Sequence, residues 1–357
     1  MSVPSQNMRW PPEADHPVVF FINGLGDNIL NLPALRALAK IFEGRLSLIC
    51  SGNEALHIFD ELPLRRLIKI EVQKKAECRE FDIKQVAKLT GECDLFISLV
   101  PWRSYSLIQL VRELRPALSV GFYHNYDIAV PLDFDKHTSE LAFDAVRLFN
   151  PSFRLRDFTA PPSHRSDALA EAQALRDSLN PGTRVLAVHA DTIPEKLWIP
   201  ARFIETLDTF LDFHKDYSAF LIGAVPQGLD EGLHAARVIP CYGLPFSISQ
   251  ALVAKADYFL GVDSCMLHVA DFAKVPGVGL FGPTRAEEFG FLVGPNVTIQ
   301  AQEQMDEIEA DEVCAALESI IADPRQSTIW ERAKGSLAQM PVADERSIAQ
   351  SGIQLAE

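Results

Sequence analysis

The fold of this chain is decided by the stretch Gly261-Val262-Asp263-Ser264-Cys265-Met266-Leu267-His268. The three apolar residues before it favour a strand, and Asp263 and Ser264 are residue types that commonly cap the N-terminus of a helix. After the helix comes a second apolar run, Val278 to Phe281, which ends in Gly282-Pro283-Thr284. The stretch therefore predicts a strand, a turn, a short helix and a second buried strand.

The start of this predicted helix is a suitable place for a phosphate group. The first N–H groups of a helix have no partner within it, and the aligned peptide dipoles make that end positive. His268 follows Ser264 by four residues, so the two side chains lie on one face of the helix start. Two interpretations stay open from this stretch alone: a phosphate site, or an ordinary capped helix with a structural histidine.

Length and composition limit the class of protein. The chain has 357 residues, which suits two domains, and its 48% apolar and 23% charged residues are typical of a globular protein. The formal charge of −15 makes the chain a poor partner for nucleic acid, which is bound through clustered Lys and Arg. A local basic pocket for a small anion remains compatible with that charge.

The sequence also predicts a cytoplasmic location. Residues 1–16 are polar and lack the apolar core of a secretion signal, and no run reaches the roughly 18 apolar residues of a membrane-spanning helix. The six cysteines are scattered without a C-x-x-C pair, which favours reduced thiols. No metal-ligand spacing occurs either, so neither a metal nor another cofactor is expected.

Two halves of the chain repeat the same alternation of strands and helices. Apolar runs such as Val18 to Ile22 and Val185 to Val188 indicate parallel strands buried on both faces. We expect an α/β protein with two Rossmann-like domains that face a central cleft. The predicted division is a flexible arm at 1–16, an N-terminal domain at 17–160, a C-terminal domain at 165–325, and a C-terminal helix and tail at 326–357.

The first predicted strand ends in a glycine-rich loop, Gly24-Leu25-Gly26-Asp27-Asn28. Its glycines permit positive φ and close approach of a ligand. Ile29 stands where the dinucleotide fingerprint has its third glycine, which argues against a redox enzyme. Asp27 has two interpretations: a helix N-cap, or a carboxylate that takes a proton from a nucleophilic hydroxyl.

The loop after a strand of the second half is a candidate anion site. It contains Thr192, whose hydroxyl can donate to an oxygen, and Lys196, which supplies a positive charge. The alternative is a solvated loop that Trp198 anchors to the core. A basic group at residues 65–75 is interpreted as a solvated face, with attraction of an anionic acceptor as the alternative.

Three separated segments together resemble the heptosyltransferase-like glycosyltransferases (glycosyltransferase family 9). Residues 24–36 resemble the opening motif of that family, and His189-Ala190-Asp191-Thr192 with Lys196 and Trp198 resembles its donor-phosphate loop. Residues 261–268 with Leu280-Phe281-Gly282-Pro283-Thr284 resemble its nucleotide-sugar motif. The matching segments keep their order over residues 18–325.

The resemblance implies a GT-B fold and a metal-independent, inverting transfer from a nucleotide-diphosphate sugar, with an ADP-sugar favoured. It implies that Asp27 is the general base, in a cleft loop with Gly24, Gly26 and Asn28. It implies a donor site made by Thr192, Lys196, Asp263, Ser264, Cys265, Met266 and His268.

The acceptor stays open between a glycan such as lipopolysaccharide core, a protein and a small molecule. Contact with a membrane surface also stays open.

Two residues depart from the pattern of the family. Cys265 stands where a glycine is usual, and Asp191 adds a negative charge near the expected diphosphate. These departures keep two alternatives open on the same fold: a non-catalytic nucleotide-sugar binding protein and a sugar-nucleotide epimerase.

Overall fold

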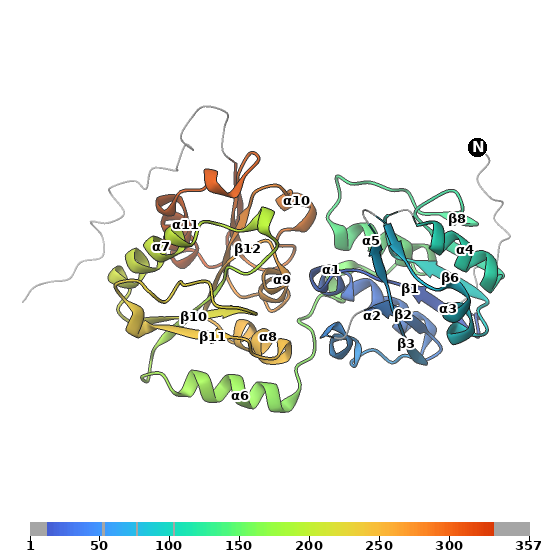
Figure 1. Cartoon of the computed structure of the whole chain (residues 1–357), viewed down its shortest axis with the longest axis horizontal. Helices are drawn as coiled ribbons and strands as arrows, with labels where there is room; N and C mark the ends of the chain where they lie inside the picture. Colours follow the sequence, from blue (N-terminus) through green and yellow to red (C-terminus); the bar gives the residue numbers. More distant parts are fainter. Residues whose placement is uncertain (1–12, 52–53, 76–77, 103, 332–357) are drawn as a thin grey trace, which may run out of the picture.

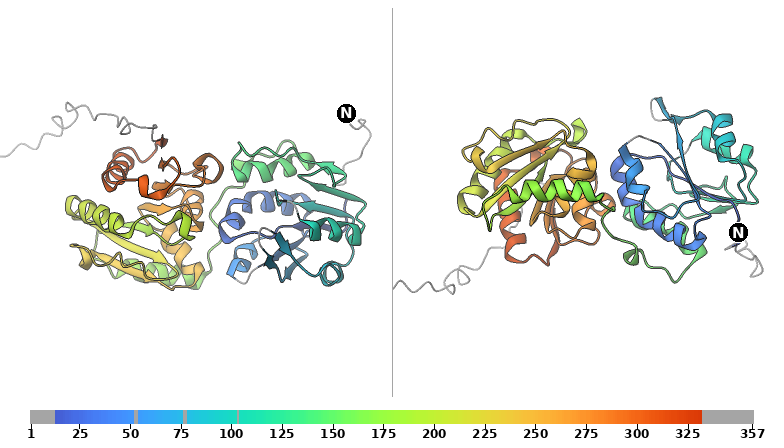
Figure 2. Two further views of the ribbon diagram at one scale, coloured as in Figure 1. Left: turned by 45° about the horizontal axis from the view of Figure 1, so that its top comes forward. Right: turned by 90° about the horizontal axis from the view of Figure 1, so that it is seen from below.

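The chain forms two domains that lie side by side (Figure 1). The computed structural model describes residues 13–51, 54–75, 78–102 and 104–331. Each domain contains one parallel sheet with helices packed against it, which confirms the α/β prediction. Figure 2 shows that a single extended segment leads from the N-terminal domain to α6, which packs against the C-terminal domain.

The N-terminal domain is built on a six-stranded sheet with the order β3-β2-β1-β6-β7-β8, and a separate hairpin of β4 and β5 lies outside it. Among its helices, α2 packs against α5 and α3 packs against α4. The elements in chain order are β1 (Pro17–Phe20), α1 (Leu25–Leu30), α2 (Leu32–Phe42), β2 (Ser47–Ser51), β3 (Arg66–Ile70), β4 (Gln73–Lys75), β5 (Cys78–Glu80), α3 (Ile83–Thr90), β6 (Leu95–Ser98), α4 (Tyr105–Leu114), β7 (Leu118–Gly121), β8 (Ile128–Ala129) and α5 (Thr138–Phe149).

The C-terminal domain is built on a seven-stranded sheet with the order β11-β10-β9-β12-β13-β14-β15. The elements in chain order are α6 (Ser166–Asp177), β9 (Arg184–His189), α7 (Pro200–Phe213), β10 (Tyr217–Gly223), β11 (Val238–Tyr242), α8 (Phe246–Ala254), β12 (Tyr258–Val262), α9 (Cys265–Phe272), β13 (Gly277–Phe281), α10 (Ala286–Phe289), β14 (Asn296–Gln300), α11 (Ala310–Ala322) and β15 (Ser327–Glu331).

The strands of the second sheet are apolar on both faces because helices cover both. Along β9, Leu186 and Val188 pack with α7 and α11, whereas Val185 and Ala187 pack with the cluster that includes α8 and α9. Successive side chains of a strand point to opposite faces, so a doubly covered strand shows a continuous apolar run. This arrangement explains why such runs, rather than alternating patterns, marked the strands in the sequence.

Two local predictions differ from the structure. The predicted C-terminal segment at 326–357 was expected to begin with a helix, but residues 327–331 form β15, which pairs in parallel with β14. The rest of that expected helix and the tail lie outside the described residues, as do residues 1–12 of the arm. The glycine-rich loop also forms a helix of its own, α1, rather than leading directly into α2.

Neither glycine of this loop adopts the positive φ that glycine permits: φ is −67° at Gly24, and Gly26 also lies outside the positive range. The lack of a side chain at Gly26 matters for packing instead. An added Cβ would lie 3.3 Å from the ring of His268 in the other domain. Glycine at this position therefore lets α1 and α9 approach each other across the domain boundary.

Candidate active site

The carboxyl ends of β1 and β12 meet at the cleft, as ligand sites of open parallel sheets generally do. Asp27 lies in the first turn of α1, directly after β1, and its side chain is half-buried. Burial raises the pKa of the Asp27 carboxyl, while the Arg79 guanidinium, the Gly24 N–H and the Lys196 ammonium oppose that rise. The base predicted from the sequence therefore lies among groups from both domains.

The N-terminal wall of the site contains a set of contacts around Asn23. The Asn23 Oδ1 atom accepts hydrogen bonds from Arg79 Nη1 at 2.6 Å and from Trp102 Nε1 at 2.9 Å. Arg79 Nη1 also donates to the carbonyl of Ile22, and its guanidinium lies 4.9 Å from the centre of the Trp102 ring. These contacts fix the guanidinium beside the loop that carries Asp27.

Asp27 and this set share a cavity of about 170 Å³. Its walls are largely apolar and aromatic, with contributions from Trp102, Phe122, Phe134 and Phe289. The last of these belongs to the C-terminal domain, so the cavity closes across the cleft. An aromatic wall beside a carboxylate suits a small ligand with both apolar faces and hydroxyl groups.

The N-terminus of α9 has the features that the phosphate interpretation requires. Ser264 is its N-cap residue in extended backbone conformation, yet its side chain makes no capping hydrogen bond. The Ser264 Oγ atom is shielded from solvent and, within the described residues, has no hydrogen-bond partner. A buried hydroxyl without a partner is uncommon, and a bound anion at the helix start would satisfy it.

His268 is buried one turn further along α9, and its Nδ1 atom also has no partner among the described side chains and backbone. Burial lowers the pKa of His268, the Asp263 carboxylate opposes this shift, and His137 and Lys196 add to it, so that the pKa is about 4. The imidazole is therefore neutral near pH 7 and can donate a hydrogen bond without bringing a positive charge.

The predicted donor-phosphate residues converge on Asp263. Lys196 Nζ lies 2.6 Å from Asp263 Oδ2, and the Thr284 hydroxyl donates to the same oxygen at 2.6 Å. The Thr192 hydroxyl donates to the backbone carbonyl of Asp263 at 3.0 Å, so its proton is used within the protein instead of pointing at a ligand. Thr284 belongs to the third motif, but it was not among the residues predicted to form the donor site.

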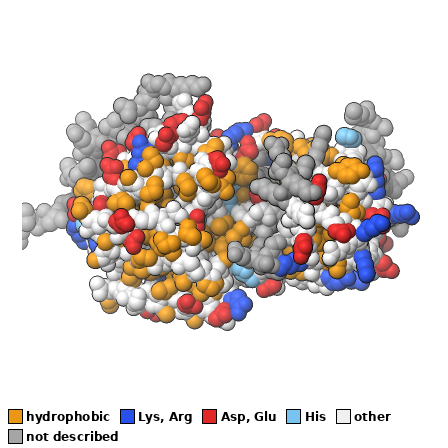
Figure 3. Space-filling model, in the orientation of Figure 1, with side chains coloured by type: hydrophobic (Ala, Val, Ile, Leu, Met, Phe, Trp, Pro, Cys, Tyr) orange, Lys and Arg blue, Asp and Glu red, His pale blue; other side chains and the backbone are white. Residues whose placement is uncertain are grey.

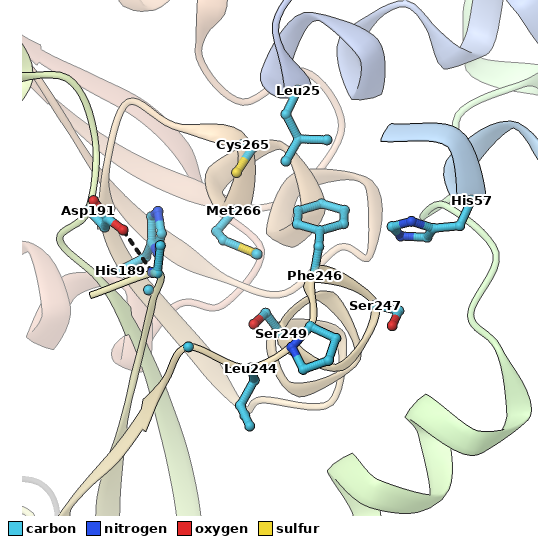
Figure 4. A pocket seen from close by; sticks show the side chains of 14 residues that line it. Leu25, His57, His189, Asp191, Leu244, Phe246, Ser247, Ser249, Cys265 and Met266 are labelled. Atoms are coloured by element: carbon cyan, nitrogen blue, oxygen red, sulfur yellow. Dashed lines mark hydrogen bonds between the residues drawn. The ribbon is translucent and has the colours of Figure 1, made fainter. Parts of the chain in front are cut away.

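A pocket of about 710 Å³ lies next to this cluster (Figure 4). It is lined from the C-terminal domain by Phe246, Cys265 and Met266, and from the N-terminal domain by Leu25 and His57. Figure 4 shows these apolar and aromatic side chains directed at one space. The pocket is large enough for a nucleoside and has aromatic surfaces for a base.

Asp191 lines the same pocket, and this position changes the interpretation of its charge. Its Oδ2 atom accepts a hydrogen bond from the Ala224 N–H at 2.8 Å, which turns the carboxylate toward the end of β10. His189, at the end of β9, donates from Nδ1 to the Ile222 carbonyl at 2.7 Å. The carboxylate thus does not join the Lys196–Asp263 pair.

The structure brings the predicted residues of the two domains together, with one exception. Asn28, expected in the cleft loop, is buried within the N-terminal domain. Sequence reasoning missed Arg79 and Trp102, since neither belongs to a motif and only the fold brings them next to Asp27. The basic residues Arg65 and Arg66 lie at the edge strand β3 or next to it, where Arg66 bonds the Leu89 carbonyl at 2.7 Å.

Lys and Arg side chains gather mainly on the N-terminal domain in the view of Figure 3. Among the described residues, no group of three or more His, Cys, Asp or Glu side chains is placed to hold a metal ion. No helix in the same part of the chain is both long and apolar enough to cross a membrane.

Part of the chain matches the model of a known protein family. Residues 144–318 match the model of glycosyltransferase family 9 (heptosyltransferase). A glycosyltransferase family 9 structure from Veillonella parvula is similar with a TM-score of 0.71 at 18% identity, over 87% of this chain and 98% of that one. No curated protein sequence matches the chain.

Two Escherichia coli enzymes have similar structures. ADP-heptose lps heptosyltransferase II has a TM-score of 0.63 at 14% identity, over 86% of this chain and 99% of that one. Heptosyltransferase WaaC with ADP has a TM-score of 0.61 at 17% identity, over 85% of this chain and 99% of that one. At such identities these likenesses show the shared fold.

The two parallel sheets with their interleaved helices form the GT-B fold. The match over residues 144–318 and the similar heptosyltransferase structures confirm the resemblance inferred from the three motifs: these residues match glycosyltransferase family 9, and the chain is a glycosyltransferase.

Proposed function

We propose that this protein transfers a sugar, a heptose or a related one, from a nucleotide-diphosphate sugar to an acceptor hydroxyl, with inversion at the anomeric carbon. The observation that carries this proposal is the meeting of α1 and α9. It sets the Asp27 carboxylate opposite a helix N-terminus whose Ser264 hydroxyl has no partner among the described residues. One side supplies a base, and the other supplies a place for the leaving diphosphate.

In the proposed step, Asp27 takes the proton of the acceptor hydroxyl while the hydroxyl oxygen attacks the anomeric carbon. The bond between that carbon and the diphosphate oxygen breaks, and its electron pair stays on the leaving nucleotide diphosphate. Attack from the side of the base, opposite the leaving group, inverts the configuration. A well-placed general base contributes about 10²- to 10⁴-fold to such a rate.

The charge that develops on the diphosphate is stabilised by groups of this chain. Lys196 and the N-terminus of α9 supply positive charge, and the neutral His268 supplies a hydrogen bond. We therefore propose a transfer that needs no metal ion. The adjacent pocket of about 710 Å³ holds the nucleoside, and the ADP-heptose enzymes with similar structures support an ADP-sugar as donor.

The acceptor is proposed as a glycan, a protein or a small molecule that reaches Asp27 from the N-terminal side, with contact at a membrane surface as one way of presenting it. A cytoplasmic location is part of the proposal, and free thiols support it: Cys50, Cys93, Cys241, Cys265 and Cys314.

The proposal is tested first by donor binding and then by transfer. Thermal unfolding with ADP-, UDP-, GDP- and dTDP-sugars identifies the donor, because a ligand that binds only the folded state raises Tm. The preferred donor is then incubated with an acceptor panel, and the anomeric configuration of the product is determined. Retention of configuration would contradict the single displacement.

The same assays separate the two alternatives on this fold. A binding protein would take up the donor and transfer it to no acceptor, and an epimerase would consume the donor with no acceptor present. Asp191, which motivated the first alternative, bonds the Ala224 N–H and not the phosphate cluster. The position of Asp191 therefore gives less support to a non-catalytic binding protein.

A further inference from the structure

Arg79 is a cation held by several contacts on the N-terminal side of the cleft. It belongs to β5, whose hairpin with β4 lies outside the six-stranded sheet. Its carbonyl accepts a hydrogen bond from the Ser104 hydroxyl at 3.3 Å, and its guanidinium bonds Ile22 and Asn23. Both its backbone and its side chain are thus tied to other elements of the domain.

Asn23 and Trp102 together fix the position of the Arg79 guanidinium. The indole N–H and the guanidinium can only donate, so the Asn23 atom between them must be its oxygen, and its two lone pairs are both occupied. Stacking at 4.9 Å on the Trp102 ring adds a cation–π contact. An arginine held in this way keeps its charge at one place.

Arg79 and Asp27 line the same cavity of about 170 Å³, the space in front of the base. We propose that Arg79 is a positioning residue for the transfer: it holds a fixed positive charge beside Asp27 and keeps that carboxylate ionised and ready to accept a proton. This inference rests on the proposed role of Asp27 as base. Neither the three motifs nor the family match assigns a role to Arg79.

The need for such a charge follows from the surroundings of Asp27. Burial and the Asp263 carboxylate both favour a protonated Asp27, which could not act as a base. Arg79 and Lys196 oppose them from the two sides of the cleft, and the first of these has the larger effect. Lys136 and Glu288 line the same cavity with opposite charges.

Lys196 cannot replace Arg79 in this role. Its ammonium already pairs with Asp263 at 2.6 Å, and in the proposed reaction it also faces the diphosphate. A cation that neutralises the leaving group has less influence on the base. Assigning one cation to the base and one to the leaving group therefore separates the two halves of the reaction.

The experiment compares Arg79→Gln, which removes the charge, with Arg79→Lys, which keeps it. We expect the acid limb of the kcat/KM profile, which reports the free enzyme, to move to higher pH by about 1 to 3 units in R79Q, the usual effect of losing an adjacent opposite charge. R79K is expected to recover most of the wild-type midpoint. Trp102→Phe, which keeps the ring but loses the bond to Asn23, should give a smaller shift in the same direction.

A second measurement separates this inference from the proposed function. The carboxyl signals of protein labelled with carbon-13 aspartate are titrated without substrate, and the Asp27 signal is identified by its absence in Asp27→Asn. Its midpoint should rise in R79Q even if the protein transfers no sugar to the acceptors tried. Lys215→Gln, an exposed lysine at the far end of β10, should leave it unchanged.

A midpoint that is the same in R79Q and wild type would overturn the inference, whatever the activity. A uniform loss of rate at all pH values in both R79Q and R79K, without a shift, would overturn it too, because it would show a purely structural role. Thermal unfolding confirms that each variant is folded. If R79Q does not fold, the direction of the shift in W102F decides.

Discussion

Two strand–turn–helix units face each other across the cleft, and they differ in one respect. The unit β1–α1 has a carboxylate, Asp27, in the first turn of its helix, whereas the first turn of α9 has no acidic residue. A helix N-terminus favours an anion. The first unit contains its own anion, and the second has a partnerless buried hydroxyl, Ser264, where an anion can bind.

This difference shows how one local fold can serve two roles in a reaction. An anion that belongs to the chain can act as a base, because it stays in the site through the reaction. A helix start without such an anion can receive the charge that a leaving group develops. The two units would lose their distinct chemistry if the Asp27 carboxylate were neutralised or the Ser264 hydroxyl were removed. Gly26 sets the distance between the two units.

The largest effect is expected from Asp27→Asn, which removes the proposed base and keeps the size of the side chain. Transfer should fall by about 10²- to 10⁴-fold, the usual contribution of a general base, while the donor binds nearly as before. Turnover rates and donor titration by calorimetry measure the two quantities.

The matched control for this variant is Asp167→Asn, an exposed carboxylate in the first turn of α6. It should leave turnover unchanged. If Asp27→Asn kept wild-type turnover, the first unit would be an ordinary helix start and the proposed mechanism would be wrong.

The distance between the two units is tested by Gly26→Ala. The added Cβ would lie 3.3 Å from the His268 ring and 3.7 Å from the Cys265 Cα, so α1 and α9 must move apart slightly. We expect turnover to fall by up to about 10²-fold, since a displacement near 1 Å can cost that much.

Gly24→Ala is the comparison for that variant, because its Cβ would meet only the Asp27 side chain, at an ordinary 3.7 Å. It should reduce turnover less than Gly26→Ala does. Equal losses in the two variants would show that close packing of α1 on α9 is not what matters.

The sequence predicts both of these units better than it predicts the residues around them. The apolar runs and capping residues marked both units, and three motifs in order indicated the family. Arg79 and Trp102 could not be predicted, because they are 52 and 75 positions from Asp27 along the chain and only the fold brings them together. The strand at 327–331 was also missed, since it is stabilised by pairing with β14, which no local pattern reveals.

The second unit is tested by Ser264→Ala. Because Ser264 makes no capping bond, its loss should change the free energy of unfolding little, while donor affinity falls about tenfold, or about 1.4 kcal/mol for one hydrogen bond to a charged group. Asp82→Ala is the contrasting variant: Asp82 caps α3 by accepting from Gln85 N at 2.9 Å.

We expect Asp82→Ala to lower the unfolding free energy by about 1 kcal/mol and to leave donor affinity unchanged. Chemical denaturation and calorimetry on both variants provide the comparison. A stability loss without an affinity loss in Ser264→Ala would show that its hydroxyl serves the helix and not the donor.

The last prediction affects stability alone and concerns His268, the neutral group of the second unit. Its pKa is lowered from its ordinary 6.5 to about 4 in the folded protein, so between these values the unfolded chain binds a proton that the folded chain does not. Stability must therefore fall as pH falls through this window, by at most about 1.4 kcal/mol per pH unit for one proton. The raised pKa of Asp27 acts in the opposite direction, so only a difference between variants isolates the histidine.

His268→Gln should flatten the dependence of unfolding free energy on pH between about 6.5 and 4, as measured by denaturation at several pH values. An unchanged slope would mean that His268 titrates in the folded protein as it does in the unfolded chain, and the proposal of a neutral imidazole held by burial in the second unit would be wrong.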